Sequence, residues 1–143
     1  MERTGLRYLL DTAPWINGVT LPAVLPQRIR RLLGNGEMKG LCSLSLLETA
    51  ILHRLGRLKF NGSLAQFFAV GLSADVRLLE PTPAIAAKPN ELPEDFPGDA
   101  FDRAIIATAA VLNLTLITAD LAIRAARACA VEYYPFTPSR PRA

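Results

Sequence analysis

The sequence predicts an α/β domain in which a central, mostly parallel sheet of about five strands lies between layers of helices. Three observations favour this fold class. Short apolar runs, too short for helices, recur along the chain. Helical patterns separate these runs, as in successive strand–helix–strand units. The length of 143 residues and the hydrophobic share of 50% suit one domain with a full core.

Five apolar runs are predicted as strands. They are 7–10 (RYLL), 40–43 (GLCS), 76–79 (VRLL), 114–118 (LTLIT) and 131–134 (VEYY). Together with the helices between them, they place a single domain at residues 1–134. The remaining segment, 135–143, contains three prolines and is expected to be a tail without regular structure.

Six segments between the strands have helical spacing of apolar residues. Pro22 suits the first turn of the first segment, and Gly56 suits the C-terminal cap of the second. The predicted helices are 21–33, 45–55, 63–72, 83–88, 101–112 and 121–128. Residues 91–98 are predicted to be an acidic, proline-rich loop.

The composition excludes several classes of protein. Two cysteines and one histidine are too few for a disulfide scaffold or a Cys/His zinc site. A Ser-His-Asp or Cys-His enzyme would have to rely on His53, which lies within a helical pattern. We find no apolar run long enough for a membrane span and no signal peptide, so we expect a cytoplasmic protein. The net charge of +3 is too small to diagnose a nucleic-acid binder.

Acidic residues occur where strands are predicted to end and helices to begin. Asp11 ends the first strand, and Asp120 follows the fourth. Glu48 is expected in the first turn of the helix after the second strand. Asp99 and Asp102 lie three apart at the start of the helix 101–112, on one face. Because ligands bind beyond the carboxyl ends of parallel strands, four or five carboxylates are expected to meet there.

Each acid also has a structural explanation. The spacing of Ser45 and Glu48 fits a capping box, and Asp99 fits an N-cap followed by a first-turn acid. Asp120 fits a helix cap and Asp11 an Asx turn. Taken together, however, several buried carboxylates would cost folding free energy unless a positively charged group pairs with them.

A divalent cation would pair with such acids. Mg²⁺ and Mn²⁺ prefer carboxylate and water oxygens, and they catalyse phosphodiester hydrolysis without Cys or His. The spacing of the acids alone fits a nuclease, a phosphatase or a simple metal-binding protein.

Four stretches resemble the PIN-domain family, and within it the VapC-type toxin ribonucleases of toxin–antitoxin pairs. Their order and intervals fit the family from residue 7 to about 134. The stretches are LLDT at 9–12, SLLETAILHRLGRLKF at 45–60, GDAFDRAIIATA at 98–109 and LTLITAD at 114–120. The resemblance implies a three-layer α/β/α PIN-like domain that hydrolyses RNA phosphodiesters with Mg²⁺ or Mn²⁺.

The resemblance also implies roles for individual residues. It makes four acids the catalytic metal ligands, namely Asp11, Glu48, Asp102 and Asp120. Asp99 matches an auxiliary acid that also binds the metal. Thr12 and Thr118 flank two ligands and are expected to orient them by hydrogen bonds. Arg103 is expected to pair with a carboxylate or to touch RNA phosphate.

The sequence departs from the family pattern around the acids. Ala13 stands where the family often has histidine, two residues after the first aspartate. Pro97 and Gly98 stand in place of His-Arg, and Ala100 replaces proline. The four core acids remain, so these changes affect substrate choice rather than catalysis.

Positive charge is needed to bind RNA phosphates. The candidate residues are Arg28, Arg30, Arg31, Arg54, Arg57 and Lys59, whose alternative role is a solvated helix face. The resemblance further implies a homodimer and a VapB-type antitoxin that inserts a segment at the acids. Two other functions stay open: another metal-dependent phosphodiesterase or phosphatase on the same fold, and an inactive RNA- or protein-binding module.

Overall fold

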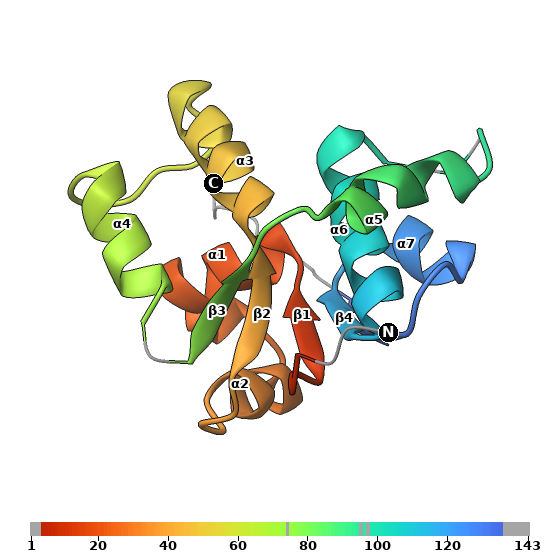
Figure 1. The fold of residues 1–143 in the computed structure, drawn as a ribbon. Helices are drawn as coiled ribbons and strands as arrows, with labels where there is room; N and C mark the ends of the chain where they lie inside the picture. Colours follow the sequence, from red (N-terminus) through yellow and green to blue (C-terminus); the bar gives the residue numbers. More distant parts are fainter. Residues whose placement is uncertain (1–3, 74, 95, 97, 136–143) are drawn as a thin grey trace.

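The computed structural model describes residues 4–73, 75–94, 96 and 98–135. Five strands form one sheet, and every neighbouring pair is parallel, so the predicted fold class is confirmed (Figure 1). The strands are β1 (Tyr8–Leu10), β2 (Lys39–Cys42), β3 (Val76–Leu79), β4 (Thr115–Thr118) and β5 (Val131–Tyr133), in the order β3-β2-β1-β4-β5. The predicted tail lies outside the described residues except for Pro135.

Helices connect successive strands. The α-helices are α1 (Thr12–Thr20), α2 (Gln27–Leu33), α3 (Ser43–Arg54), α4 (Leu64–Gly71), α5 (Pro83–Ala87), α6 (Ala100–Leu112) and α7 (Leu121–Ala126). Two 3₁₀ turns, η1 (Pro22–Val24) and η2 (Lys88–Glu91), complete the connections. Within the described ranges, no helix has the length and apolar character needed to cross a membrane.

Alternate residues of the strands point to opposite faces of the sheet. Leu9, Cys42 and Leu116 join one apolar cluster, to which α5 and α6 contribute buried side chains. Leu10 and Ile117 join a second cluster with α1, α2 and α4. Helices therefore cover both faces, and Figure 1 shows α5, α6 and α7 together on one side of the sheet.

The predicted helix 21–33 is wrong. Its second half is α2, but η1 occupies its first half, and Pro26 is the residue before α2 begins. Proline lacks the backbone N–H of a helix interior, so Pro26 separates the two elements. The sequence analysis also missed α1, where Pro14 and Gly18 obscure the helical pattern.

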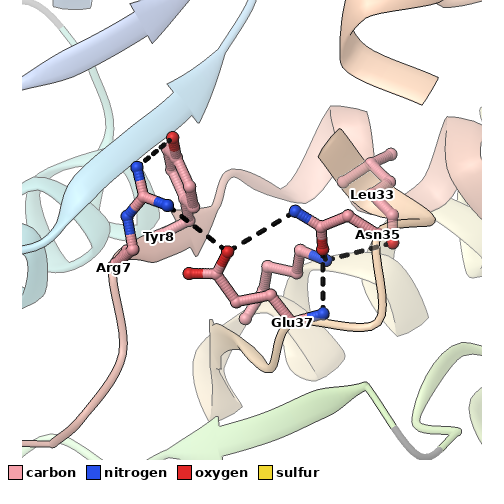
Figure 2. A network of polar contacts seen from close by, with 6 residues as sticks. Arg7, Tyr8, Leu33, Asn35 and Glu37 are labelled. Atoms are coloured by element: carbon pink, nitrogen blue, oxygen red, sulfur yellow. Dashed lines mark hydrogen bonds and ion pairs between the residues drawn. The ribbon is translucent and has the colours of Figure 1, made fainter. Parts of the chain in front are cut away.

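A polar network joins the start of β1 to the turn between α2 and β2, at the amino edge of the sheet (Figure 2). Lys39 Nζ is buried and donates to Leu33 O at 3.2 Å and to Asn35 Oδ1 at 2.6 Å. The same Asn35 oxygen accepts the Glu37 N–H, and Glu37 lies 3.5 Å from Arg7. These contacts give the buried Lys39 ammonium hydrogen-bond acceptors, and they fix the residue at which β2 begins.

Trp15 anchors α4 against α1. Its ring is 3% exposed and packs edge-on against Phe67. Its Nε1 donates to Gly71 O at 2.8 Å, at the last residue of α4. A Cβ atom at Gly71 would lie 2.6 Å from Trp15 Cζ2, so this approach requires glycine.

The substitution Gly71→Ala is expected to lower the free energy of unfolding by about 1–3 kcal/mol, because the added methyl group displaces the Trp15 ring. Urea denaturation would measure it. The matched control is Gly18→Ala within α1, whose Cβ would meet only the tip of Leu33 at 3.3 Å. This control gains helix propensity and is expected to change stability by less than about 1 kcal/mol. Equal stabilities for the two variants would contradict the proposed role of the Trp15 contact.

Candidate metal site at the carboxyl edge of the sheet

Four helices begin where parallel strands end. Helices α1, α3 and α7 directly follow β1, β2 and β4. Helix α6 follows the loop after η2, and it begins at the same edge of the sheet. A cavity of about 510 Å³ opens between them. Its acidic lining residues are Asp11, Glu48, Asp102 and Asp120. The topology thus brings together four acids that lie far apart in the sequence, as the sequence analysis expected.

Asp11 is the N-cap of α1 and is 8% exposed. Its Oδ1 accepts the Thr12 N–H at 2.8 Å, and its Oδ2 accepts the Thr118 hydroxyl at 2.7 Å. One carboxylate oxygen is therefore held by the start of α1 and the other by the end of β4. Burial raises the pKa of Asp11 above its ordinary value, although the bonds from Thr118 and Thr12 act in the opposite direction.

Glu48 is not part of a capping box. Helix α3 begins at Ser43, and its N-cap is Cys42, so Ser45 already lies within the first turn. Ser45 is fully buried, and its hydroxyl lies 2.9 Å from the Thr12 hydroxyl. Glu48 Oε1 is buried and has no hydrogen-bond partner among the described residues.

Asp99 and Asp102 form a reciprocal capping box at the start of α6. The Asp102 N–H donates to Asp99 Oδ1 at 3.0 Å, and the Asp99 N–H donates to Asp102 Oδ2 at 3.3 Å. Gly98 precedes them with φ +106°, and a Cβ there would lie 2.7 Å from Asp102 Cβ. This explains the glycine that departs from the family pattern, whereas Pro97 lies outside the described residues.

Asp120 is the N-cap of α7 and accepts the Ala122 N–H at 2.9 Å. Its own N–H donates to the Thr118 hydroxyl at 3.1 Å. Thr118 therefore connects the backbone of Asp120 to the carboxylate of Asp11. Thr12 contacts Asp11 through its backbone and Ser45 through its hydroxyl.

Three of the acids approach one another closely. Glu48, Asp99 and Asp102 each offer a carboxylate oxygen, and these oxygens lie within 4.8 Å of one another. The pKa of Asp102 is raised to about 6, mainly by burial and then by the charges of Asp99 and Asp11. Burial also raises the pKa of Glu48; the side chain of Thr12 acts in the opposite direction, and the charges of Asp11 and Asp99 add smaller increases.

The basic residues named in the sequence analysis separate into groups. Arg57 lines the acid cavity, whereas Lys59 lies beyond it, and Arg54 is exposed on α3. Arg30 and Arg31 are exposed on α2, which does not line the cavity. Arg28, also on α2, instead pairs with Glu132 at 2.5 Å, at the edge strand β5.

In the described part of the chain Arg103 pairs with no carboxylate, so the first of its two expected roles is not seen, and contact with RNA phosphate stays a prediction. Its Nη2 donates to the carbonyl oxygens of Phe96 and Glu94, and its guanidinium lies 5.5 Å from the centre of the Phe96 ring. Arg103 thus fastens the loop before α6. Its position one residue after Asp102 directs it away from the acids because successive helical residues face different sides.

Two polar residues near the acids were missed from the sequence. Asn17 lines the cavity from α1, together with Ala13 and Ile16. The spacing i, i+3, i+4 would have placed them on one face, had α1 been predicted. Ser45 was assigned to a cap rather than to the buried contact with Thr12, because the start of α3 was placed two residues late.

The family model for the PIN domain matches residues 8–128. The chain belongs to the PIN-domain family. No curated protein sequence matches this PIN domain.

Solved structures share the fold of this PIN domain. VapBC2 from Rickettsia felis bound to a promoter DNA fragment is similar with a TM-score of 0.69 and 16% identity, over 90% of this chain and 98% of that one. DNA-bound VapBC from Salmonella typhimurium has a TM-score of 0.68 and 18% identity, and the match covers 90% of this chain and 98% of that one. VapC20 from Mycobacterium tuberculosis, a Sarcin-Ricin loop cleaving toxin, has a TM-score of 0.58 and 20% identity. The match covers 94% of this chain and 99% of that one.

The raised pKa of Asp102 predicts a pH dependence in metal-free protein. An unfolded aspartate titrates near pH 3.9 and folded Asp102 near pH 6, so the folded state holds the proton more tightly. The free energy of unfolding therefore falls as the pH rises between these values and stays lower above pH 6. In chelator at pH 7.5, Asp102→Asn is expected to melt at a higher temperature than the unsubstituted protein.

Melting curves at several pH values would test this effect, and the difference is expected to vanish near pH 4. The control is Glu37→Gln, which removes one negative charge at the opposite edge of the sheet, away from the acid cavity. Asn keeps an oxygen that accepts the Asp99 N–H, so the helix cap survives. A lower melting temperature for Asp102→Asn at pH 7.5 would contradict the electrostatic explanation.

Proposed function

We propose that this PIN domain is a metal-dependent endoribonuclease that hydrolyses RNA phosphodiester bonds, acting as the toxin of a toxin–antitoxin pair. The observation that carries the proposal is the meeting of four carboxylates in one cavity at the carboxyl edge of the sheet. Close carboxylates repel one another, which raises the free energy of the metal-free fold. A bound divalent cation removes that repulsion, so the arrangement suits a metal site.

The donor groups fit Mg²⁺ or Mn²⁺. Asp11, Glu48, Asp102 and Asp120 would hold the ion, with Asp99 as an additional ligand, and these residues offer only oxygen atoms. Glu48 Oε1 supports this assignment, because it is buried and has no hydrogen-bond partner within the described ranges, and such an oxygen costs folding free energy. The raised pKa values mean that protons compete with the cation, so binding is expected to weaken below about pH 6.

Other residues hold the ligands in place. The Thr118 hydroxyl and the Thr12 N–H bind the two oxygens of Asp11, and the start of α7 holds Asp120. Arg57 adds a positive charge to the wall of the cavity, where it can attract the phosphate of a substrate. When bound, the cation supplies charge stabilisation at the phosphate and lowers the pKa of a bound water.

The choice of RNA and of a toxin role rests on the similar structures. One of them is a toxin that cleaves the Sarcin-Ricin loop, and two others are VapBC complexes. We therefore expect a VapB-type antitoxin as partner, a homodimer as the assembly and the cytoplasm as the location. The resemblance of the four sequence stretches to VapC-type toxins supports the same expectation.

The substitution Asp11→Asn is expected to abolish metal-dependent RNA cleavage, because Asp11 is the most deeply buried of the proposed ligands. The assay follows the length of a labelled single-stranded RNA incubated with purified protein in Mg²⁺, in Mn²⁺ and in chelator. A loss of at least about 10²-fold is expected, the scale on which removing one preorganised electrostatic group acts.

The control is Glu37→Gln, which removes an acid at the amino edge of the sheet and is expected to cleave at the unsubstituted rate. Circular dichroism melts would check that both variants fold. Cleavage by Asp11→Asn at the unsubstituted rate, or cleavage that persists in chelator, would overturn the assignment of the site.

A further inference from the structure

A second hollow lies beside the acid cavity and has no role in the proposed chemistry. It measures about 550 Å³, within the range of ligand sites in proteins. Its wall is formed by the end of α1, the segment between α3 and α4, and α4 itself. The residues that line it include Val19, Thr20, Lys59, Phe60, Asn61 and Val70.

The hollow and the acid cavity are lined by neighbouring turns of α1. Ile16 and Asn17 line the cavity and Thr20 lines the hollow, so these lining residues lie about one helical turn apart along the helix. The segment after α3 repeats this order, because Arg57 lines the cavity and Lys59 the hollow. A substrate strand with one phosphate at the acids would therefore reach the hollow with its next nucleotide.

The turn that ends α3 positions this segment. Gly56 has φ +74°, and the Gly56 and Arg57 N–H groups donate to His53 O and Leu52 O. This pattern is a Schellman motif, which fixes the direction in which the chain leaves the helix. Arg57 is thereby held at the wall of the acid cavity, and the residues after it line the hollow.

One wall of the hollow is rigid and apolar. The Phe60 ring stacks on His53 and on Phe67, with ring centres 4.6 Å apart in both pairs. Phe67 in turn packs against the buried Trp15. Val70, on α4, is 63% exposed and also lines the hollow. A flat, apolar group that enters the hollow meets packed aromatic rings that need little rearrangement.

The polar groups of the hollow favour a nucleotide. Lys59 and Asn61 are exposed, and neither side chain makes an ion pair or hydrogen bond with a residue that the structure describes. An ammonium suits a phosphate, and an amide both donates and accepts, as the edge of a base requires. None of the described residues that line the hollow is acidic, so the positive charge of Lys59 complements the negative charge of RNA.

We propose that this hollow binds the base of the nucleotide next to the one whose phosphate lies at the acids, with Lys59 on the adjoining phosphate. The occupant is single-stranded RNA, because only an unpaired base can leave its stack to enter a side pocket. This inference rests on the proposed function and adds to it a residue set that selects and positions the substrate.

The test fills the hollow by Val70→Trp and measures binding of a fluorescent, mixed-sequence RNA of eight nucleotides. Binding is measured in the Asp11→Asn background, so that the RNA stays intact, and cleavage in the unsubstituted background. Filling the hollow is expected to weaken binding about tenfold, the scale of one base contact. In cleavage, the same variant raises KM and leaves kcat unchanged, since the lost contact is to bound substrate.

The matched control is Leu78→Trp, which places the same ring on the exposed edge strand β3. Asn61→Ala is the second variant; it removes an exposed side chain and leaves the fold intact, and it is expected to weaken binding in the same direction. RNA affinities and KM values of both variants equal to those of the control would overturn the inference. A loss of binding to a partner protein alone, with RNA binding unchanged, would also overturn it.

The outcome separates this inference from the proposed function. If the unsubstituted protein cleaves RNA with metal and Val70→Trp matches it in KM, only the role of the hollow is wrong. If the unsubstituted protein neither binds nor cleaves RNA with metal, the proposed function itself is wrong, and the inference falls with it.

Discussion

The parallel sheet imposes one constraint on which the structure depends: strand carboxyl ends and helix amino ends meet at a single edge. Backbone N–H groups at a helix start favour a negative charge, so an aspartate placed there stabilises its helix. Asp11, Asp99 and Asp120 are the N-caps of α1, α6 and α7. The structural and the metal-binding explanations of these acids are therefore compatible, because the same geometry that caps each helix also gathers the carboxylates.

Much of the fold follows from local sequence. The five apolar runs were predicted as strands because each is short and lies between segments with helical spacing, and all five are present in the sheet. The acids were located from the same reasoning, since a residue that ends a parallel strand must lie at the carboxyl edge. Residues such as Asp11 and Asp120 could thus be assigned to one place without knowledge of any contact.

The rest depended on contacts that local sequence does not reveal. Helix α1 contains Pro14 and Gly18, yet it forms because Trp15 and Ile16 are buried beneath α4 and against the sheet. The role of Arg28 required the edge strand β5, more than a hundred residues away. Arg103 lies beside an acid in sequence, but its helix position directs it to the loop carbonyls of Phe96 and Glu94.

The central claim is that the acids at the carboxyl edge form one site for a divalent cation. The most direct measurement is a titration of Mn²⁺ followed by electron paramagnetic resonance, which detects the free ion. The account predicts that the unsubstituted protein removes Mn²⁺ from solution at pH 7.5 and that the double variant Asp11→Asn, Asp102→Asn removes none. Equal Mn²⁺ binding by the two proteins, or no binding by either, would contradict the claim.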